Sequence, residues 1–350
     1  MARGEERILR RRIKSIQATK KITRAMELIA SSQIVRSQAR LHAAEPYQLA
    51  VEAVIAEATS EPFTGLEKLV GVPDSPAHVA LLVVVADRGL CGGYNVNVLR
   101  SAERLLDELK TNGVEARVFT VGRKAVSYFR FRHRPVEKSF TGFSDRPQFD
   151  DALQVAEALS ASFLAGEVDQ VLVLSTRFLS QGTQSVERRQ VLPLPVLVGK
   201  SGGTQAVAGE ALGSARGEPA PGAGPAPGAG PAPGAGPAPG REPASGGGPA
   251  TGPAAGAGGY PELEPEGAEL LDELVPRYVE AAVFGALLEA AASEHTARQR
   301  AMAAATDNAD ELVKTLTRVM NRARQDAITT EIMEIVGGAE ALRDARKGNQ

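Results

Sequence analysis

Paired cysteines, tryptophan and long apolar runs are all missing from this sequence of 350 residues. The single cysteine, Cys91, excludes a disulfide within the chain and favours a reducing compartment. No apolar run approaches the roughly 20 residues that span a bilayer, and no hydrophobic segment of a signal peptide follows the first charges. We therefore expect a cytosolic protein, peripheral to a larger assembly, that is built more from thin helices than around a large aromatic core.

Proline and glycine are almost missing from the two ends of the chain. Glu5–Ala58 contains no glycine and only one proline, Pro46, and the only proline of Val275–Asp344 is Pro276. As continuous helices these segments would measure roughly 80 and 100 Å, far more than the diameter of a compact domain. The two helices must therefore project from any globular body and be covered by each other or by a partner protein.

Apolar residues recur every three or four positions in both terminal segments. The first stripe is Ile8, Leu9, Ile13, Ile16, Ile22, Met26 and Ile29, and the second is Leu312, Val313, Leu316, Val319, Met320, Ala323, Ala327, Ile328, Ile332 and Ile335. Stripes with a period of about 3.5 to 3.6 residues can face each other in an antiparallel helix pair. Between Ala290 and Ala305 the second stripe is mostly alanine, which lets a neighbouring helix approach closely.

The middle of the chain alternates between strand and helix patterns. Strands are expected at Val79–Ala86, Ala116–Val121, Gln170–Leu174 and Val186–Leu194, and helices at 96–110, 123–131 and 149–165. This order predicts a small α/β domain with a mostly parallel sheet. The wholly apolar run Val79–Ala86 is typical of a strand that is buried on both faces.

Residues 199–259 differ in composition from the rest of the chain. Three GAGPAP units run from Gly222 to Pro239, and the flanks are rich in Gly, Pro, Ala and Ser. Such a segment buries too little apolar surface to offset the entropy of ordering, so we expect a disordered insert. The predicted organisation is an N-terminal helix (1–60), an α/β domain (76–198 with a last strand in 260–265), the insert (199–259) and a C-terminal helix (266–350).

The formal net charge of −2 does not favour binding of the chain as a whole to nucleic acid or to a membrane surface. Residues 1–40 nevertheless contain eleven basic and three acidic side chains. A basic region that binds DNA adjoins a leucine heptad of the same helix, whereas here the apolar stripe runs through the basic residues. The pattern favours a solvated face or contact with an acidic protein surface.

The segment Asp87–Asn95 (DRGLCGGYN) follows a buried strand and opens a helix, as a phosphate-binding loop does. Its spacing matches neither G-x-G-x-x-G nor G-x-x-x-x-G-K-[ST], and no lysine of the segment reaches a phosphate, which favours a tight turn. A nucleophilic Cys91 would need a base, but the four histidines cannot be placed beside it from sequence and lack the spacing of metal ligands. They are His42, His78, His133 and His295. We expect no catalytic residue, metal or cofactor in this chain.

Polar residues interrupt the C-terminal stripe at 306–308, 324–325 and 329–331. Short polar side chains are poor helix formers, so their presence in a helix needs a reason. Two readings stay open: they decorate the surface, or they form hydrogen bonds to an encircling partner.

Three blocks of residues resemble one known family, the γ subunits of F-type ATP synthases. They are 13–27 (IKSIQATKKITRAME), the Asp87–Asn95 turn, and the run from 301 to 339 that contains ATDN, ARQ, ITTE and EIVGGA. The third block is specific, and the resemblance covers the whole chain except 199–259. It implies a small Rossmann-like α/β domain with two long terminal helices that form an antiparallel, left-handed coiled coil.

The resemblance also implies a function without catalytic residues. The coiled coil would turn inside a hexamer of α and β subunits, while the α/β domain and the ε subunit would rest on the c-ring in the membrane. Catalysis and Mg-ATP or Mg-ADP would belong to the α and β subunits. At matching positions, Arg24 and Met26 would meet an acidic loop of β, and Arg324 and Gln325 a catch loop with Thr329 and Glu331 nearby. The chain would lie at the cytoplasmic face of a bacterial membrane, held there by its partners.

The insert at 199–259 departs from the family pattern. Plant γ subunits carry a regulatory cysteine pair in this domain, but this insert contains no cysteine. A brake on hydrolysis or on ε docking is one interpretation, although a tolerated loop expansion is favoured because long loops cost little. Unchanged hydrolysis and unchanged inhibition by ε after deletion of 200–258 would exclude the brake. The alternative to the family reading is a homodimeric coiled-coil scaffold or a DNA-binding α/β protein.

Overall fold

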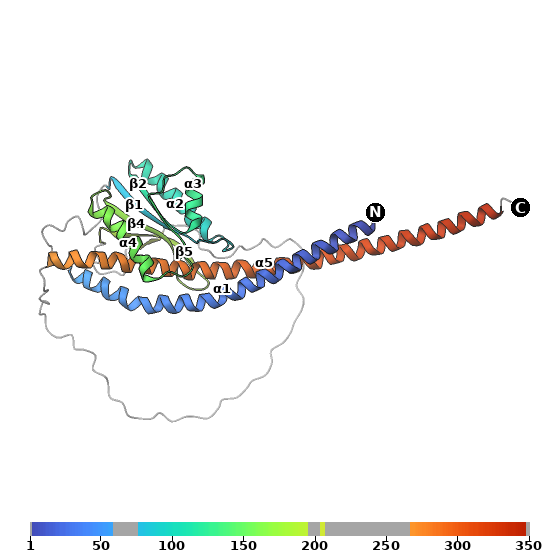
Figure 1. Ribbon diagram of the computed structural model, residues 1–350, viewed down its shortest axis with the longest axis horizontal. Helices are drawn as coiled ribbons and strands as arrows, with labels where there is room; N and C mark the ends of the chain where they lie inside the picture. The colour runs from blue at the N-terminus through green and yellow to red at the C-terminus, as the bar shows by residue number, and fades with distance from the viewer. Residues whose placement is uncertain (1, 59–75, 195–203, 207–266, 348–350) are drawn as a thin grey trace, which may run out of the picture. The chain divides into compact units, whose positions relative to one another are not determined.

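A computed structural model describes residues 2–58, 76–194, 204–206 and 267–347 (Figure 1). Its two longest elements are α1 (Ala2–Ala58) and α5 (Gly267–Lys347), with 57 and 81 residues. Between them lie β1 (His78–Val84), α2 (Tyr94–Thr111), β2 (Glu115–Val121), α3 (Arg123–Phe131), β3 (Lys138–Phe140), α4 (Phe149–Leu164), β4 (Gln170–Phe178), β5 (Gln184–Leu192) and β6 (Thr204–Ala206).

The helices α1 and α5 pack against each other in opposite directions (Figure 1). Three contacts set their register: Lys20 Nζ to Asp310 Oδ1 (2.6 Å), Thr23 Oγ1 to Thr306 Oγ1 (2.8 Å), and Gln48 Nε2 to the carbonyl of Ala281 (3.0 Å). Helix α1 approaches so closely at the last contact that a Cβ on Gly285 would lie 1.8 Å from the Gln48 amide nitrogen. A glycine is therefore required there unless Gln48 moves.

The strands form one mixed sheet in the order β3-β2-β1-β4-β5-β6. The pairs β2–β3, β1–β2 and β1–β4 are parallel, whereas β4–β5 and β5–β6 are antiparallel. The parallel part follows from the β-α-β order of the sequence, because each parallel connection needs a crossover helix. β5 can be antiparallel to β4 because a hairpin of five residues joins them.

Helices cover both faces of the sheet. Along β1, Val79, Leu81 and Val83 pack with residues of α2 and α3, such as Val98 and Phe129. The alternate residues of β1 pack with α4 and with the first half of α5. Every residue of Val79–Val84 is thus buried, which is why this strand reads as a continuous apolar run.

The strands differ from the expectation in several places. β1 ends at Val84, two residues early, because Val85 and Ala86 are buried in the following turn and hydrophobicity alone does not mark the end. β5 is likewise shifted by two residues, to Gln184–Leu192. The strand β3 was not predicted, because it has only three residues. The strand β6 forms within the range 199–259 that was expected to be disordered. The expected strand at 260–265 lies outside the described residues.

Candidate functional site: the turn after β1 and the surfaces of the long helices

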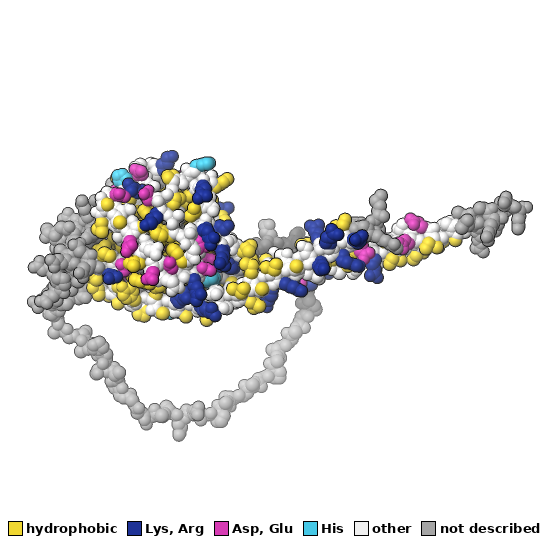
Figure 2. Space-filling view, in the orientation of Figure 1, with side chains coloured by type: hydrophobic (Ala, Val, Ile, Leu, Met, Phe, Trp, Pro, Cys, Tyr) yellow, Lys and Arg dark blue, Asp and Glu magenta, His cyan; other side chains and the backbone are white. Residues whose placement is uncertain are grey.

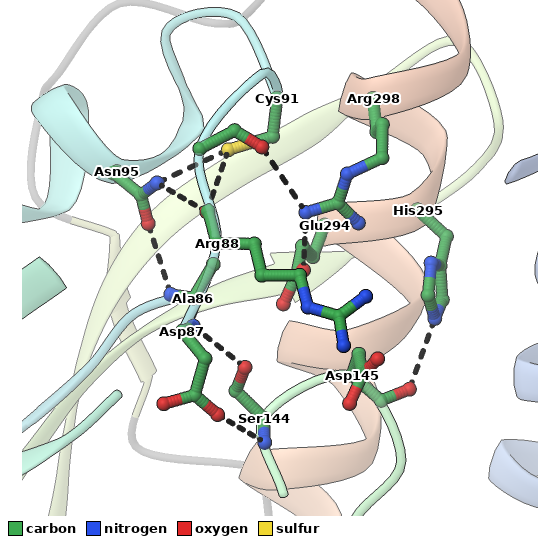
Figure 3. Close-up of polar contacts among 11 residues, drawn as sticks. Ala86, Asp87, Arg88, Cys91, Asn95, Ser144, Asp145, Glu294, His295 and Arg298 are labelled. Atoms are coloured by element: carbon green, nitrogen blue, oxygen red, sulfur yellow. Dashed lines mark hydrogen bonds and ion pairs between the residues drawn. The ribbon is translucent and has the colours of Figure 1, made fainter. Parts of the chain in front are cut away.

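The Asp87 carboxylate organises the turn after β1 (Figure 3). It accepts hydrogen bonds from the backbone N–H groups of Arg123 (3.0 Å), Gly142 (2.8 Å) and Ser144 (3.2 Å). Partial burial raises the pKa of Asp87, but these hydrogen bonds outweigh it and leave the pKa below its ordinary value. The carboxylate is thus committed to holding the start of α3 and the loop before α4.

The other polar side chains of the turn are also engaged internally. Asn95 accepts a hydrogen bond from the Ala86 N–H (2.9 Å) and donates to the Arg88 carbonyl (3.3 Å) and to Cys91 Sγ (3.1 Å). Burial and the nearby Glu294 carboxylate raise the pKa of the Cys91 thiol. A raised pKa keeps the thiol protonated, which is unfavourable for a nucleophile.

A hollow of about 430 Å³ lies beside the turn, on the side of α2 and α3. Its lining is mostly apolar and includes Leu90, Val96, Tyr128 and Phe131. Lys124 also lines it, within 4 Å of the position that a Cβ on Gly89 would take. The sequence interpretation found no lysine for this turn because Lys124 approaches from α3, beyond the next strand.

The four histidines lie apart from one another along the described chain. His42 faces Glu45 (3.5 Å), His78 faces Glu115 and Asp169 (3.7 Å each), and His295 Nε2 bonds the carbonyl of Asp145 (2.9 Å). His133 lies after α3 with φ of 54°. Among the described residues, no three metal-binding side chains come together.

The two halves of α5 differ in exposure. From Val275 to Met302 most side chains are buried against the sheet, α4 and α1. Beyond Met302, large apolar side chains are exposed, and α1 exposes others: Leu312, Val319, Ile328, Ile332, Met333, Ile335 and Val336 on α5, and Ile8, Ile22 and Ile29 on α1. Figure 2 shows basic side chains over the N-terminal part of α1 and apolar ones along the adjoining end of α5.

The six predicted contact residues lie at two separate levels of this helix pair. Arg24 is exposed and ion-paired with Glu27 (2.8 Å), and Met26 is half-buried. The register places these residues opposite the part of α5 near residue 304. Arg324, Gln325, Thr329 and Glu331 are exposed on α5, level with the start of α1 or beyond it. About 20 residues, or about 30 Å of helix, separate the two levels.

Thr306 fits neither of the two readings left open for the polar residues of α5, surface decoration or hydrogen bonds to an encircling partner. Its hydroxyl is buried, donates to the carbonyl of Met302 (2.8 Å) and shares a hydrogen bond with Thr23 (2.8 Å). It therefore joins the two helices of this chain. Spacing within one helix could not have indicated this partner, which lies 283 residues away.

Together these features define a class of protein: an α/β domain mounted on a pair of long helices whose far ends expose apolar and basic side chains. A family model described as ATP synthase matches residues 5–342. The ATP synthase gamma chain of Frankia casuarinae is 42% identical over 343 residues, covering 97% of this chain and 98% of that protein. That of Streptomyces griseus is 40% identical and covers 98% of both chains. The chain belongs to the family of ATP synthase γ chains.

Solved structures share the fold at low sequence identity. A chain from the F1/c-ring structure of Euglena gracilis mitochondrial ATP synthase matches with a TM-score of 0.60 and 13% identity, covering 98% of this chain and 96% of that chain. A chain from the central stalk and c-ring of Tetrahymena thermophila matches with a TM-score of 0.53 and 19% identity, covering 81% and 99%. In the described part of the chain, no helix is both long and apolar enough to cross a membrane.

Proposed function

We propose that this chain is the central rotor stalk of a proton-translocating ATP synthase. The observation that carries the proposal is identity of about 40% with bacterial gamma chains along nearly the whole length of both sequences. The opposed packing of α1 and α5 supports an antiparallel coiled coil as the shaft. Exposed apolar side chains at its far end support insertion into a surrounding partner.

The stalk couples rotation to nucleotide turnover and performs no chemistry itself. Proton flow through the c-ring turns the α/β domain, and the asymmetric shaft changes the nucleotide affinity of each β subunit in turn. This is coupling between distant sites through rigid packing. The α and β subunits bind the Mg-nucleotides, the ε subunit and the c-ring contact the α/β domain, and the chain lies at the cytoplasmic face of the membrane through these partners.

The predicted contact residues form two sites, at different heights along the helix pair, at which the β subunits hold the shaft; we call these sites bearings. At the first, Arg24 and Met26 face an acidic loop of β, which the excess of basic side chains in residues 1–40 supports. At the second, Arg324 and Gln325 meet a catch loop, with Thr329 and Glu331 close by. A separation of about 30 Å between bearings constrains tilt of the shaft better than a single bearing would.

Co-expression with the α and β subunits of the same organism tests the proposal. We expect one copy of this chain for three α and three β subunits, and MgATP hydrolysis that is lost when residues 1–25 and 326–350 are both removed. The proposal would be contradicted if no complex formed, or if hydrolysis by the complex did not change when this chain is truncated. Self-association of the chain alone would then favour the homodimeric scaffold.

A further inference from the structure

Residues 293–300 of α5 connect to several parts of the α/β domain at once. The contacts are Ser293 Oγ to the carbonyl of Thr176 (3.4 Å), His295 Nε2 to the carbonyl of Asp145 (2.9 Å), and Arg300 Nη1 to the carbonyl of Gly182 (3.2 Å). They reach β4, the loop before α4 and the β4–β5 hairpin. This short stretch of helix therefore adds polar, directional contacts to the apolar packing that holds the domain on residues 275–290 of α5.

The fastening lies at the point where the strand order of the sheet reverses. β1 has β2 on one side and β4 on the other, and α5 crosses the carboxyl ends of β1 and β4. In doubly wound folds this edge is where ligands bind. Here two charged side chains of α5, Glu294 and Arg298, occupy it (Figure 3).

Glu294 and Arg298 form a buried ion pair that also holds the turn after β1. Arg298 Nη2 lies 2.6 Å from Glu294 Oε1, and it donates to the carbonyl of Gly89 at 3.5 Å. The side chains are only 2% and 11% exposed. Glu294 Oε2 is buried and has no hydrogen-bond partner within the described residues.

Stability does not account for such a pair. Removing two charges from water costs several kcal/mol each, and apolar side chains of similar volume are often equally stable or more so. The surroundings suit apolar replacement, since Ala86, Cys91, Tyr94 and Ala297 form a small apolar cluster beside the pair. The pair must therefore contribute something that apolar packing does not.

The ion pair adds hydrogen bonds that depend on the orientation of the domain relative to α5. Apolar contact is non-directional, so an apolar joint resists separation better than it resists sliding or twisting. The N–H donors of a guanidinium point in fixed directions, and one nitrogen of Arg298, Nη2, faces both the carboxylate of its own helix and the backbone of the turn. Rotation of the domain about α5 would break the second contact and leave a buried guanidinium less well paired.

We propose that Glu294 and Arg298 are positioning residues that fix the angle of the α/β domain on the shaft and so transmit torque between the two. This rests on the proposed function, because torque enters at the domain and leaves at the far ends of α1 and α5. Loss of the pair should therefore uncouple the two ends while leaving each able to perform its own part.

The test uses the complete synthase in membrane vesicles, with Glu294→Met and Arg298→Met combined so that no buried charge remains unpaired. We expect normal subunit stoichiometry and an unfolding temperature that is unchanged or higher. We expect ATP synthesis driven by an imposed proton gradient to fall about fivefold or more relative to ATP hydrolysis of the ring-free complex. Arg298→Lys, which retains the charge but replaces the rigid guanidinium by a shorter and more mobile ammonium group, should lie between the double variant and the unaltered chain.

The matched control is Glu167→Gln, which removes the exposed ion pair with Arg117 (2.6 Å) in the same domain and should leave the ratio unchanged. An unchanged ratio of synthesis to hydrolysis in the double variant Glu294→Met with Arg298→Met would overturn the proposal while leaving the rotor function intact. Equal loss of synthesis and hydrolysis would also overturn it, since a merely structural role lowers both. If the proposed rotor function were wrong, hydrolysis by the α and β subunits would be the same with and without the unaltered chain.

Discussion

The buried and the exposed halves of α5 belong to one helix but have opposite surroundings. Between Val275 and Met302, Ala, Val and Leu side chains fill the space between the sheet and α1, and even charged residues are enclosed. Beyond Met302, Ile332 and Ile335 are 54% and 72% exposed. Helices in proteins gain most of their stability from packing of an apolar face. Among the described elements, the exposed half packs only on α1, through contacts such as Lys20–Asp310 and Thr23–Thr306, and therefore needs a further partner.

Removal of one member of the buried pair should give the largest effect on the stability of the chain. Arg298→Met leaves the Glu294 carboxylate buried and unpaired, and we expect a loss of about 3 to 5 kcal/mol in the free energy of unfolding. Urea unfolding of the full chain, followed by circular dichroism, measures it. A loss as small as that of a surface substitution would contradict the description of residues 275–302 of α5 as buried.

The pH dependence of the same variant provides a second test. Burial already raises the pKa of Glu294, and loss of the Arg298 charge, which lowers it, raises it further. A carboxyl group whose folded pKa is raised favours folding below its ordinary pKa of 4.5, and this contribution is lost as the pH rises through the folded pKa. The deficit of Arg298→Met should therefore be smaller at about pH 5 than at about pH 8.

Matched apolar truncations sharpen the comparison between the two halves. Leu287 is 2% exposed, and Leu287→Ala should cost about 3 kcal/mol because it removes packed atoms and leaves a cavity. Val319, which is 45% exposed, should lose only about 0.5 kcal/mol on substitution by Ala. Urea unfolding measures the stability of both variants. Equal losses would refute the distinction between a buried half of α5 before Met302 and an exposed half beyond it.

The exposed half should matter in the complex rather than in the isolated chain. Ile332→Ser removes an apolar side chain that we expect a partner to cover, and should weaken binding to the α and β subunits about tenfold. Ile332→Leu, which preserves apolar volume, is the control and should retain affinity. Titration of the labelled chain with α and β subunits measures the dissociation constant. If Ile332→Ser bound as tightly as the unaltered chain, the partner subunits would not cover this part of α5.

The smallest effect is expected where the two helices meet in solvent. Lys20 and Asp310 form an exposed ion pair, and the hydrogen bond from Lys20 lowers the pKa of Asp310. Exposed pairs contribute little and are screened by salt. Lys20→Met should scarcely change the urea midpoint at low salt and not at all at high salt, whereas a large effect that persists in salt would indicate a stronger role for this contact.

The sequence predicted the elements better than their contacts. The 3.6-residue stripes gave both long helices, and the apolar run gave β1, because in each case neighbouring residues share one environment. β3 was missed because three residues are too few to show a period, and the end of β1 because the turn after it is equally apolar. The joint at Arg298 could not be found from sequence, since its partner Gly89 contributes only a backbone carbonyl and lies 209 residues away.

Amide hydrogen exchange along α5, compared between the isolated chain and its complex with α and β subunits, tests the account most directly. Exchange reports local opening, which is frequent where few apolar contacts hold a helix. We predict that residues 275–302 are protected in both states, and that residues 303–339, which of the described elements contact only α1 in the isolated chain, gain protection in the complex. Equal protection of 303–339 in both states would contradict the claim that this half of α5 is the surface that partners cover.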